Sequence, residues 1–283
     1  MQSASLASGK GHRDENFPVA SVLLRAEHRA PIMAFYRFAR AADDVADHPT
    51  APPAEKLTRL AALRAGLDGR GDANEALTLR DVMAGRDLDP VHAHDLLDAF
   101  VQDVSVPRYA SWADLIGYCR KSAMPVGRYV LDVHRESRAI WPANDALCAA
   151  LQIVNHLQDC GKDYRALDRV YLPLESLAAH GARIDDLAAP AASPALRATV
   201  ADLAVRTAGL LTESARFAGL IRDRRLAAEV AVIQRLAVSL NDRLSTRDPL
   251  SQRVHHRPWE AALLASAAVV RQFTAPRPPG RAA

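Results

Sequence analysis

The chain has 283 residues, of which 49% are apolar and 5% aromatic, and 36 basic and 33 acidic residues give it a formal net charge of +3. A chain of this length can bury a substantial core, and the absence of a basic stripe argues against a nucleic-acid partner. Its three cysteines are too few and too scattered for a disulfide framework or a zinc site, so we expect a reducing, cytoplasmic location.

Apolar residues repeat at helical spacing through most of the chain, which predicts an all-α fold. We expect a flexible arm over 1–14, one domain over 15–274 and a flexible tail over 275–283, because no stretch has the composition of an interdomain linker. The aromatic residues after Tyr171 are expected to pack in the core; they are Phe217, Trp259 and Phe273. Helices are predicted near 17–29, 31–47, 54–67, 73–84, 90–103, 111–119, 124–137, 144–163, 195–222, 225–243 and 258–272.

The first of two acidic pairs ends a polar stripe on the helix expected over 31–47. At about 100° per residue, Tyr36, Arg40, Asp43 and Asp47 fall within an arc of about 60°, and most other positions of this helix are apolar. Two carboxylates at D-x-x-x-D spacing repel each other, so helix stability gives no reason for them. A polar-lined internal cavity explains this stripe better than a solvated face does.

The second acidic pair ends a matching stripe on the helix expected over 144–163. Here Gln152, Asn155, Asp159 and Asp163 share an arc of about 80°. An ordinary solvated face stays open as the explanation for this helix alone. Two facing stripes would let four carboxylates hold Mg²⁺, with a diphosphate completing the coordination shell.

Four ordered segments carry the most specific signal: 36–47 (YRFARAADDVAD), 118–127 (YCRKSAMPVG), 151–163 (LQIVNHLQDCGKD) and 169–173 (RVYLP). Together they resemble the squalene/phytoene synthase family, from about residue 16 to the end of the domain. The resemblance implies a single-domain isoprenoid synthase bundle around a central cavity, with Mg²⁺ as cofactor and a prenyl diphosphate as substrate. An apolar product would then require handover to another pathway enzyme or a peripheral contact with the inner face of a membrane.

The resemblance also implies roles for individual residues. Asp43, Asp47, Asp159 and Asp163 would bind Mg²⁺ at the catalytic centre. Arg40 would hold a diphosphate, and Tyr36 would face the reacting carbons. Arg169 and Tyr171 would close over the leaving group. The implied substrate-binding positions are Phe17, Gln152, Asn155, Gln158, Arg169 and Tyr171.

Local features point to one branch of the family. Segments 15–21 (ENFPVAS) and 121–128 (KSAMPVGR) resemble hydroxysqualene synthases of bacterial hopanoid pathways. Condensing members usually carry Arg or Lys at the position of Gln158, so a neutral residue fits an enzyme that holds one diphosphate; neutral drift is the alternative.

The implied reaction is that of a carbon–oxygen lyase. Presqualene diphosphate would ionise, its cyclopropane ring would open, and water would capture the cation to give hydroxysqualene. Two alternatives stay open: head-to-head condensation of two prenyl diphosphates to presqualene diphosphate, squalene or phytoene, and a catalytically inactive interaction protein.

Overall fold

The computed structural model describes residues 23–274, and this part of the chain is helical, as predicted. It contains no strand; an isolated bridge joins Arg108 to Val170. The arm and tail predicted at the two ends, and Phe17 within residues 15–21, lie outside the described residues.

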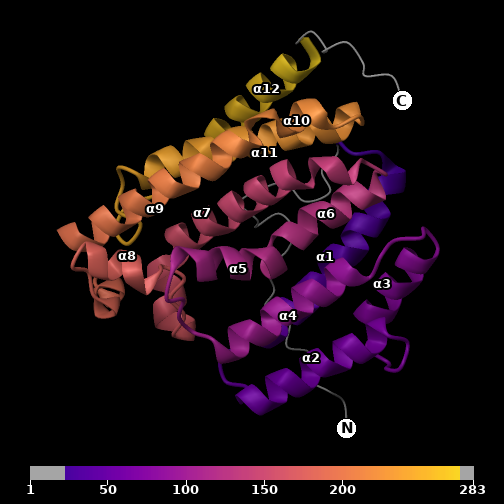
Figure 1. Ribbon diagram of the computed structural model, residues 1–283, viewed down its shortest axis with the longest axis horizontal. Coiled ribbons are helices and arrows are strands. Elements are labelled where there is room, and N and C mark those ends of the chain that lie inside the picture. Colours follow the sequence, from indigo (N-terminus) through magenta and orange to yellow (C-terminus); the bar gives the residue numbers. More distant parts are fainter. Residues whose placement is uncertain (1–22, 275–283) are drawn as a thin grey trace.

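The helices follow one another in the order shown in Figure 1. They are α1 (Ala26–Ala46), α2 (Pro53–Leu67), α3 (Asn74–Ala84), α4 (Val91–Ser105), α5 (Trp112–Ser122), α6 (Met124–Val133), α7 (Trp141–Leu167), α8 (Leu174–Ala179), α9 (Pro194–Glu213), α10 (Phe217–Leu220), α11 (Arg224–Leu244) and α12 (Pro258–Thr274), with short 3₁₀ helices η1 (Arg138–Ile140), η2 (Ile184–Ala188) and η3 (Ser214–Arg216) between them.

Helix α7 runs through the middle of the bundle and packs against α5, α6, α9 and α11 (Figure 1). Its apolar side chains enter two separate hydrophobic clusters. Leu147 belongs to the cluster that includes α1 to α4, whereas Ile153 and Leu157 belong to the cluster that includes α5 and α9. Each such fully buried aliphatic side chain contributes about 1.5–3 kcal/mol. The polar side of α7 therefore lies at a fixed place between two packed layers.

The predicted break before Pro31 was wrong, because α1 continues through this proline. Proline has no N–H for the carbonyl four residues earlier, which usually ends or kinks a helix. Here the freed carbonyl of Glu27 accepts a hydrogen bond of 2.7 Å from the guanidinium of Arg86, in the loop after α3. A distant side chain thus satisfies the group that the proline leaves unpaired, and α1 carries its polar stripe as one rigid element.

Other helix boundaries also differ from the prediction. Residues 23–25 are not helical although a helix was predicted near 17–29, and the helix predicted over 124–137 ends at Val133. The helix expected over 195–222 ends at Glu213 and gives way to η3 and α10. The Ser214 hydroxyl, fully buried at this point, bonds to the Leu211 carbonyl and to Gln234, which allows the chain to turn. Helix α7 is longer than expected and ends at Leu167; Asp168, which follows it, has a left-handed φ of 51°. The six-residue helix α8 was not predicted, because it is too short to show a period.

Helices α6 and α7 approach each other closely at Gly127. A Cβ at this position would meet the side chains of Asn144 and Cys148 on α7. Glycine is required here for the close approach of the backbone. The contact brings the segment 118–127, at the end of α5 and the start of α6, close to α7.

Helix α12 lies on the outside of the bundle and packs against α11 through Leu264 and Ala268 (Figure 1). The prediction that Trp259 and Phe273 are core residues was wrong: they are 62% and 45% exposed. Phe217, in contrast, is buried in the core as predicted. Within residues 23–274 we find no helix with the length and apolar character needed to span a bilayer.

Candidate active site

A cavity of about 380 Å³ brings both predicted stripes together. Its walls come from α1, α4, α5, α6, α7 and the segment that follows α7. The sequence-predicted residues that line it are Tyr36, Arg40, Asp43, Asp47, Gln152, Asp163, Arg169 and Tyr171.

The α1 wall of the cavity combines cationic and anionic side chains. Arg40 forms ion pairs with Asp43, three residues ahead, and with Asp44, at 2.7 Å. Burial, followed by the nearby charge of Asp47, raises the pKa of Asp43 to about 7. One guanidinium therefore does not compensate the negative charge that this helix brings into the cavity.

Asp47 sits directly after the last helical residue of α1 and pairs with Arg169. The Arg169 guanidinium is buried and also donates to the backbone carbonyls of Ala46, at 3.0 Å, and Asp103, at 3.1 Å. Lys56 donates to the same Ala46 carbonyl at 2.9 Å. Arg169 therefore ties together the C-terminal ends of α1 and α4 around the cavity.

The α7 wall supplies Gln152 and Asp163. Burial, followed by the charge of Asp159, raises the pKa of Asp163 to about 7, and Asp47 from the opposite helix adds to the shift. The charge of Asp47, at the end of α1, therefore acts on Asp163 of α7 across the cavity.

Three predicted site residues on α7 are not among those lining the cavity. Asp159 is 38% exposed at its side chain and lies 3.7 Å from Lys162. Asn155 is half-buried, and Gln158 is buried against the protein core. Their metal- and substrate-binding roles stay predictions.

A hydrogen-bonded group around Asp103 completes the cavity, and sequence reasoning missed it. The hydroxyls of Tyr118 and Tyr171 donate to the two carboxylate oxygens of Asp103, at 2.8 and 2.9 Å. Burial raises the pKa of Asp103 to about 6. A signal existed, because Asp103 falls seven residues after Leu96, on the apolar face of α4.

His156 forms an aromatic wall with Tyr171 and was also missed. The two rings are stacked with centroids 3.6 Å apart, and the Gln152 amide nitrogen lies 3.0 Å from His156 Nε2. Burial, with Arg169 nearby, lowers the pKa of His156 to about 3. The imidazole is therefore neutral at physiological pH and adds an aromatic face rather than a charge.

A second, apolar pocket of about 290 Å³ adjoins the polar cavity. Tyr36, Ala39 and Val126 line both spaces and so mark their junction. Beyond the junction the walls of the pocket are largely aliphatic and aromatic, and they include Phe217 of α10 and Ile233 of α11. The combined space suits a molecule with an anionic head and a long hydrocarbon body.

The donor set of the polar cavity fits a hard divalent cation. Asp43, Asp47 and Asp163 present carboxylate oxygens to one space, and the pKa values of Asp43 and Asp163 are raised because burial and like charge are not fully compensated. Oxygen donors of this kind suit cations such as Mg²⁺, which keep open positions for phosphate. Arg40 on the same wall suits a diphosphate.

The helical bundle, its carboxylate-lined cavity and the adjoining apolar pocket define a helical isoprenoid synthase. Comparison with known proteins specifies the family: the model of the squalene/phytoene synthase family matches residues 11–260, and the chain belongs to that family.

The chain is similar over most of its length to characterised relatives. It is 53% identical to the hydroxysqualene synthase of Zymomonas mobilis, with 94% of this chain and 90% of the relative aligned. It is 55% identical to the hydroxysqualene synthase of Rhodopseudomonas palustris, over 92% of this chain and 90% of the relative. The phytoene synthase of Thermus thermophilus is 31% identical, over 93% and 91%.

Solved structures share the fold. A squalene synthase from Alicyclobacillus acidocaldarius superposes with a TM-score of 0.67 at 26% identity, covering 90% of this chain and 88% of the other. A dehydrosqualene synthase gives a TM-score of 0.80 at 20% identity, covering 93% of both chains.

Proposed function

We propose that this protein converts presqualene diphosphate and water to hydroxysqualene and diphosphate, with Mg²⁺ as the metal. The carbon–oxygen bond to the diphosphate breaks and its electron pair leaves with the diphosphate. The cyclopropylcarbinyl cation opens its ring, and water adds to the cation and loses a proton. The observation that carries this proposal is the polar cavity opening onto an apolar pocket at Tyr36. Identities of 53% and 55% to named hydroxysqualene synthases support the branch.

The residues of the polar cavity would bind the head of the substrate. Asp43, Asp47 and Asp163 would hold Mg²⁺, with Asp159 and Asn155 joining from the neighbouring turns of α7. The metal supplies charge neutralisation for the departing diphosphate. Arg40, already facing Asp43, would turn its guanidinium to the diphosphate oxygens, and Arg169 would hold Asp47 in place from the buried side.

The aromatic side chains would face the cation. Tyr36 stands at the junction where the reacting carbons pass from polar to apolar surroundings. Tyr118 and Tyr171 are held in place by Asp103, so their rings are preorganised at the cavity wall. A cation over an aromatic face is stabilised by about 0.5–2 kcal/mol, more when water is excluded.

The departing diphosphate is the best acceptor for the proton of the attacking water. Both oxygens of Asp103 already accept hydrogen bonds from tyrosines, and the low pKa of His156 makes it a weak base. Gln152, beside His156 in the cavity wall, can hold the water without taking its proton.

Head-to-head condensation is the rival reaction, because condensing relatives share the fold. The test supplies the purified protein and Mg²⁺ with either presqualene diphosphate or farnesyl diphosphate, without NADPH, and identifies the lipid products. The proposal predicts hydroxysqualene from presqualene diphosphate and no product from farnesyl diphosphate. A product from farnesyl diphosphate would establish the condensing branch, and turnover of neither by folded protein would favour an inactive interaction protein.

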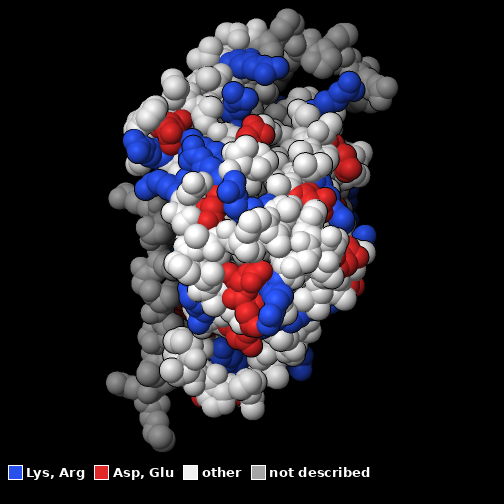
Figure 2. Space-filling model, turned by 90° about the vertical axis from the view of Figure 1, so that its left-hand side faces the viewer, with Lys and Arg blue, Asp and Glu red and all other residues white. Residues whose placement is uncertain are grey.

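We also propose that the outer face of α12 contacts a membrane surface, where an apolar product would leave. Trp259, Leu263, Val270 and Phe273 lie within an arc of about 80° and are 45% to 65% exposed. The acidic residue of this helix, Glu260, is held 3.2 Å from Arg243 rather than facing outward. Figure 2 shows basic and acidic side chains on the upper part of one face of the molecule. Beside the stripe itself, the guanidinium carbon of Arg224 of α11 lies 5.1 Å from the centroid of the Phe273 ring, and Arg271 stands in the last turn of α12. An apolar stripe among basic groups suits anionic lipids better than a protein surface.

Vesicle sedimentation tests this contact. The protein should bind vesicles that contain an anionic phospholipid more tightly than neutral ones, and the double variant Trp259→Ser, Leu263→Ser should lose binding. Val205→Ser removes an apolar side chain of α9 that is 68% exposed and should bind as the wild type does. Equal binding by the double variant and the wild type would refute the contact, and a dimer that the double variant abolishes would assign the face to a second copy.

A further inference from the structure

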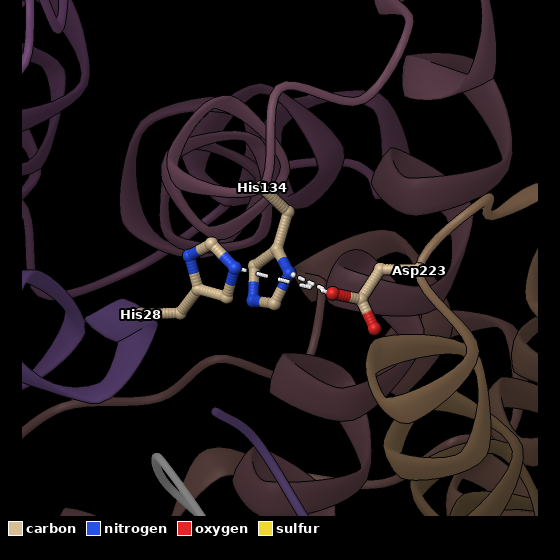
Figure 3. Close-up of side chains that lie close together, drawn as sticks. All are labelled: His28, His134 and Asp223. Carbon is tan, nitrogen blue, oxygen red and sulfur yellow. Dashed lines mark hydrogen bonds and ion pairs between the residues drawn. The ribbon is translucent and has the colours of Figure 1, made fainter. Parts of the chain in front are cut away.

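Three side chains from distant parts of the chain meet at one point outside the carboxylate-lined cavity (Figure 3). His28 comes from the first turn of α1, His134 directly follows α6, and Asp223 directly precedes α11. One ligating atom from each lies within 4.8 Å of the other two. The Asp223 Oδ2 atom is 3.2 Å from His134 Nδ1 and 4.0 Å from His28 Nε2.

The three side chains are shielded from solvent and preoriented. His134 is fully buried at its side chain, and His28 and Asp223 are 17% and 15% exposed. Asp223 caps α11: its Oδ1 accepts from the backbone N–H groups of Arg225 and Leu226. The other oxygen, Oδ2, points at the histidines. Metal-ligating carboxylates are commonly oriented in this way, by hydrogen bonds to the oxygen that does not bind the metal.

His28 faces the cluster through one of its two ring nitrogens (Figure 3). This nitrogen, Nε2, lies 3.6 Å from a Glu27 oxygen and 4.0 Å from Asp223 Oδ2, and both separations are longer than a hydrogen bond. The other nitrogen, Nδ1, lies on the far side of the ring and is buried without a hydrogen-bond partner among the described residues. An ion between Nε2 and the Asp223 carboxylate would be within bonding distance of both atoms.

The spacing of the three side chains is close to that of a metal site. A tetrahedral Zn²⁺ with bonds of about 2.0–2.2 Å places neighbouring ligand atoms about 3.3–3.6 Å apart. The separations of 3.2 and 4.0 Å to Asp223 Oδ2 bracket this range. The two imidazole rings lie against each other with centroids 4.0 Å apart, so His28 has to turn its ring away from His134 for both nitrogens to point at one ion.

We propose that His28, His134 and Asp223 bind a transition-metal ion of the Zn²⁺ class. The ion would join the start of α1 to the C-terminal end of α6 and the N-terminal end of α11. Glu27, whose side chain is 59% exposed, or water supplies the fourth ligand. Leu24 and Leu226, each within four residues of a ligand, line the apolar pocket, so the metal holds the chain at one end of that pocket. The site shares no residue with the carboxylate-lined cavity, and the proposal does not depend on the reaction.

Titration of the chelator-treated, untagged chain with Zn²⁺ tests the proposal, with Mg²⁺ in excess to occupy the carboxylates. We expect one equivalent of Zn²⁺ to bind and to raise the melting temperature. His28→Gln should weaken Zn²⁺ binding by more than about 100-fold, since loss of a ligand exceeds the 10–100-fold cost of losing an outer partner. His28 is partly exposed, so this variant should fold; a melting curve without metal checks it.

Two control variants show whether a loss of Zn²⁺ binding is specific to the cluster of His28, His134 and Asp223. His94→Gln removes a histidine paired with Asp68 at 3.3 Å outside the cluster, and Asp43→Asn alters the carboxylate-lined cavity. Both should bind Zn²⁺ as the wild type does, and Co²⁺ bound to the wild type should show the visible absorption of a tetrahedral site. No Zn²⁺ binding by the wild type, unchanged affinity in His28→Gln, or equal loss in His94→Gln would overturn the proposal.

Discussion

Replacing Arg169 by Ala should destabilise the protein strongly, because this guanidinium serves three partners at the cavity wall. It donates to the Ala46 carbonyl at 3.0 Å and to the Asp103 carbonyl at 3.1 Å, and it pairs with the Asp47 carboxylate. Its side chain is 8% exposed, so water cannot replace these bonds in the folded state. The Asp103 carbonyl would lose this donor, whereas the Ala46 carbonyl would keep its hydrogen bond from Lys56.

The magnitude follows from these contacts. A hydrogen bond from a charged donor is worth about 1.5–3 kcal/mol, so the two carbonyl bonds together contribute about 3–6 kcal/mol. Because Lys56 also donates to the Ala46 carbonyl, the lower end of this range applies. The Asp47 side chain is 40% exposed, and solvent screening limits that pair to about 1 kcal/mol. We therefore expect the unfolding free energy of the metal-free protein to fall by about 4 kcal/mol.

Urea denaturation monitored by circular dichroism measures this loss. Arg165→Ala is the matched control: this arginine is exposed and bonds to one carbonyl, that of Leu187, at 3.2 Å, so its loss should cost about 1 kcal/mol or less. A loss for Arg169→Ala no greater than that of Arg165→Ala would refute the assigned role of the buried guanidinium.

Three further predictions concern the two cavities. Asp43→Asn and Asp163→Asn should each lower kcat/KM by at least about 1000-fold, about 4 kcal/mol of transition-state stabilisation, while the far-ultraviolet spectrum stays unchanged; wild-type turnover in either would contradict the metal assignment. The pKa of Asp163 is raised to about 7 in the folded protein, whereas the carboxyl of an unfolded chain has a pKa near 3.8. As the pH rises, the unfolded state therefore loses this proton first, and the unfolding free energy of the metal-free protein should fall between these two pH values. Melting curves in EDTA should show this fall, and Asp163→Asn should reduce it; an identical pH profile in the variant would count against the shift. Ala39→Phe, at the junction of the cavities, should block the hydrocarbon body and reduce turnover by about 100-fold or more without loss of stability, which steady-state kinetics and a melting curve would decide together.

The local pattern was sufficient to predict the polar stripe of α1. Tyr36, Arg40 and Asp43 lie on α1 and Asp47 directly follows it, so a fixed angle per residue places them on one face, and all four line the cavity. The stripe of α7 was predicted less completely. Gln152 and Asp163 line the cavity, but Asp159 does not, because the exact rotation of a long helix depends on the packing of both its faces.

Features that depend on distant partners were out of reach of the sequence pattern. The break expected at Pro31 is prevented by Arg86, which is far away in the chain. Asp103 lies on the apolar face of α4, and its role in the cavity depends on Tyr118 and Tyr171 from other segments of the chain. The cluster of His28, His134 and Asp223 likewise exists only after three segments have packed together.

The central claim is that water captures a cation formed from presqualene diphosphate in the cavity lined by Asp43 and Asp163. Turnover of presqualene diphosphate with Mg²⁺ in water enriched in oxygen-18, followed by mass spectrometry of the product, tests it most directly. The account predicts hydroxysqualene that carries one oxygen-18 atom at its hydroxyl, formed without NADPH. Unlabelled hydroxysqualene, or no hydroxysqualene from folded protein, would contradict it.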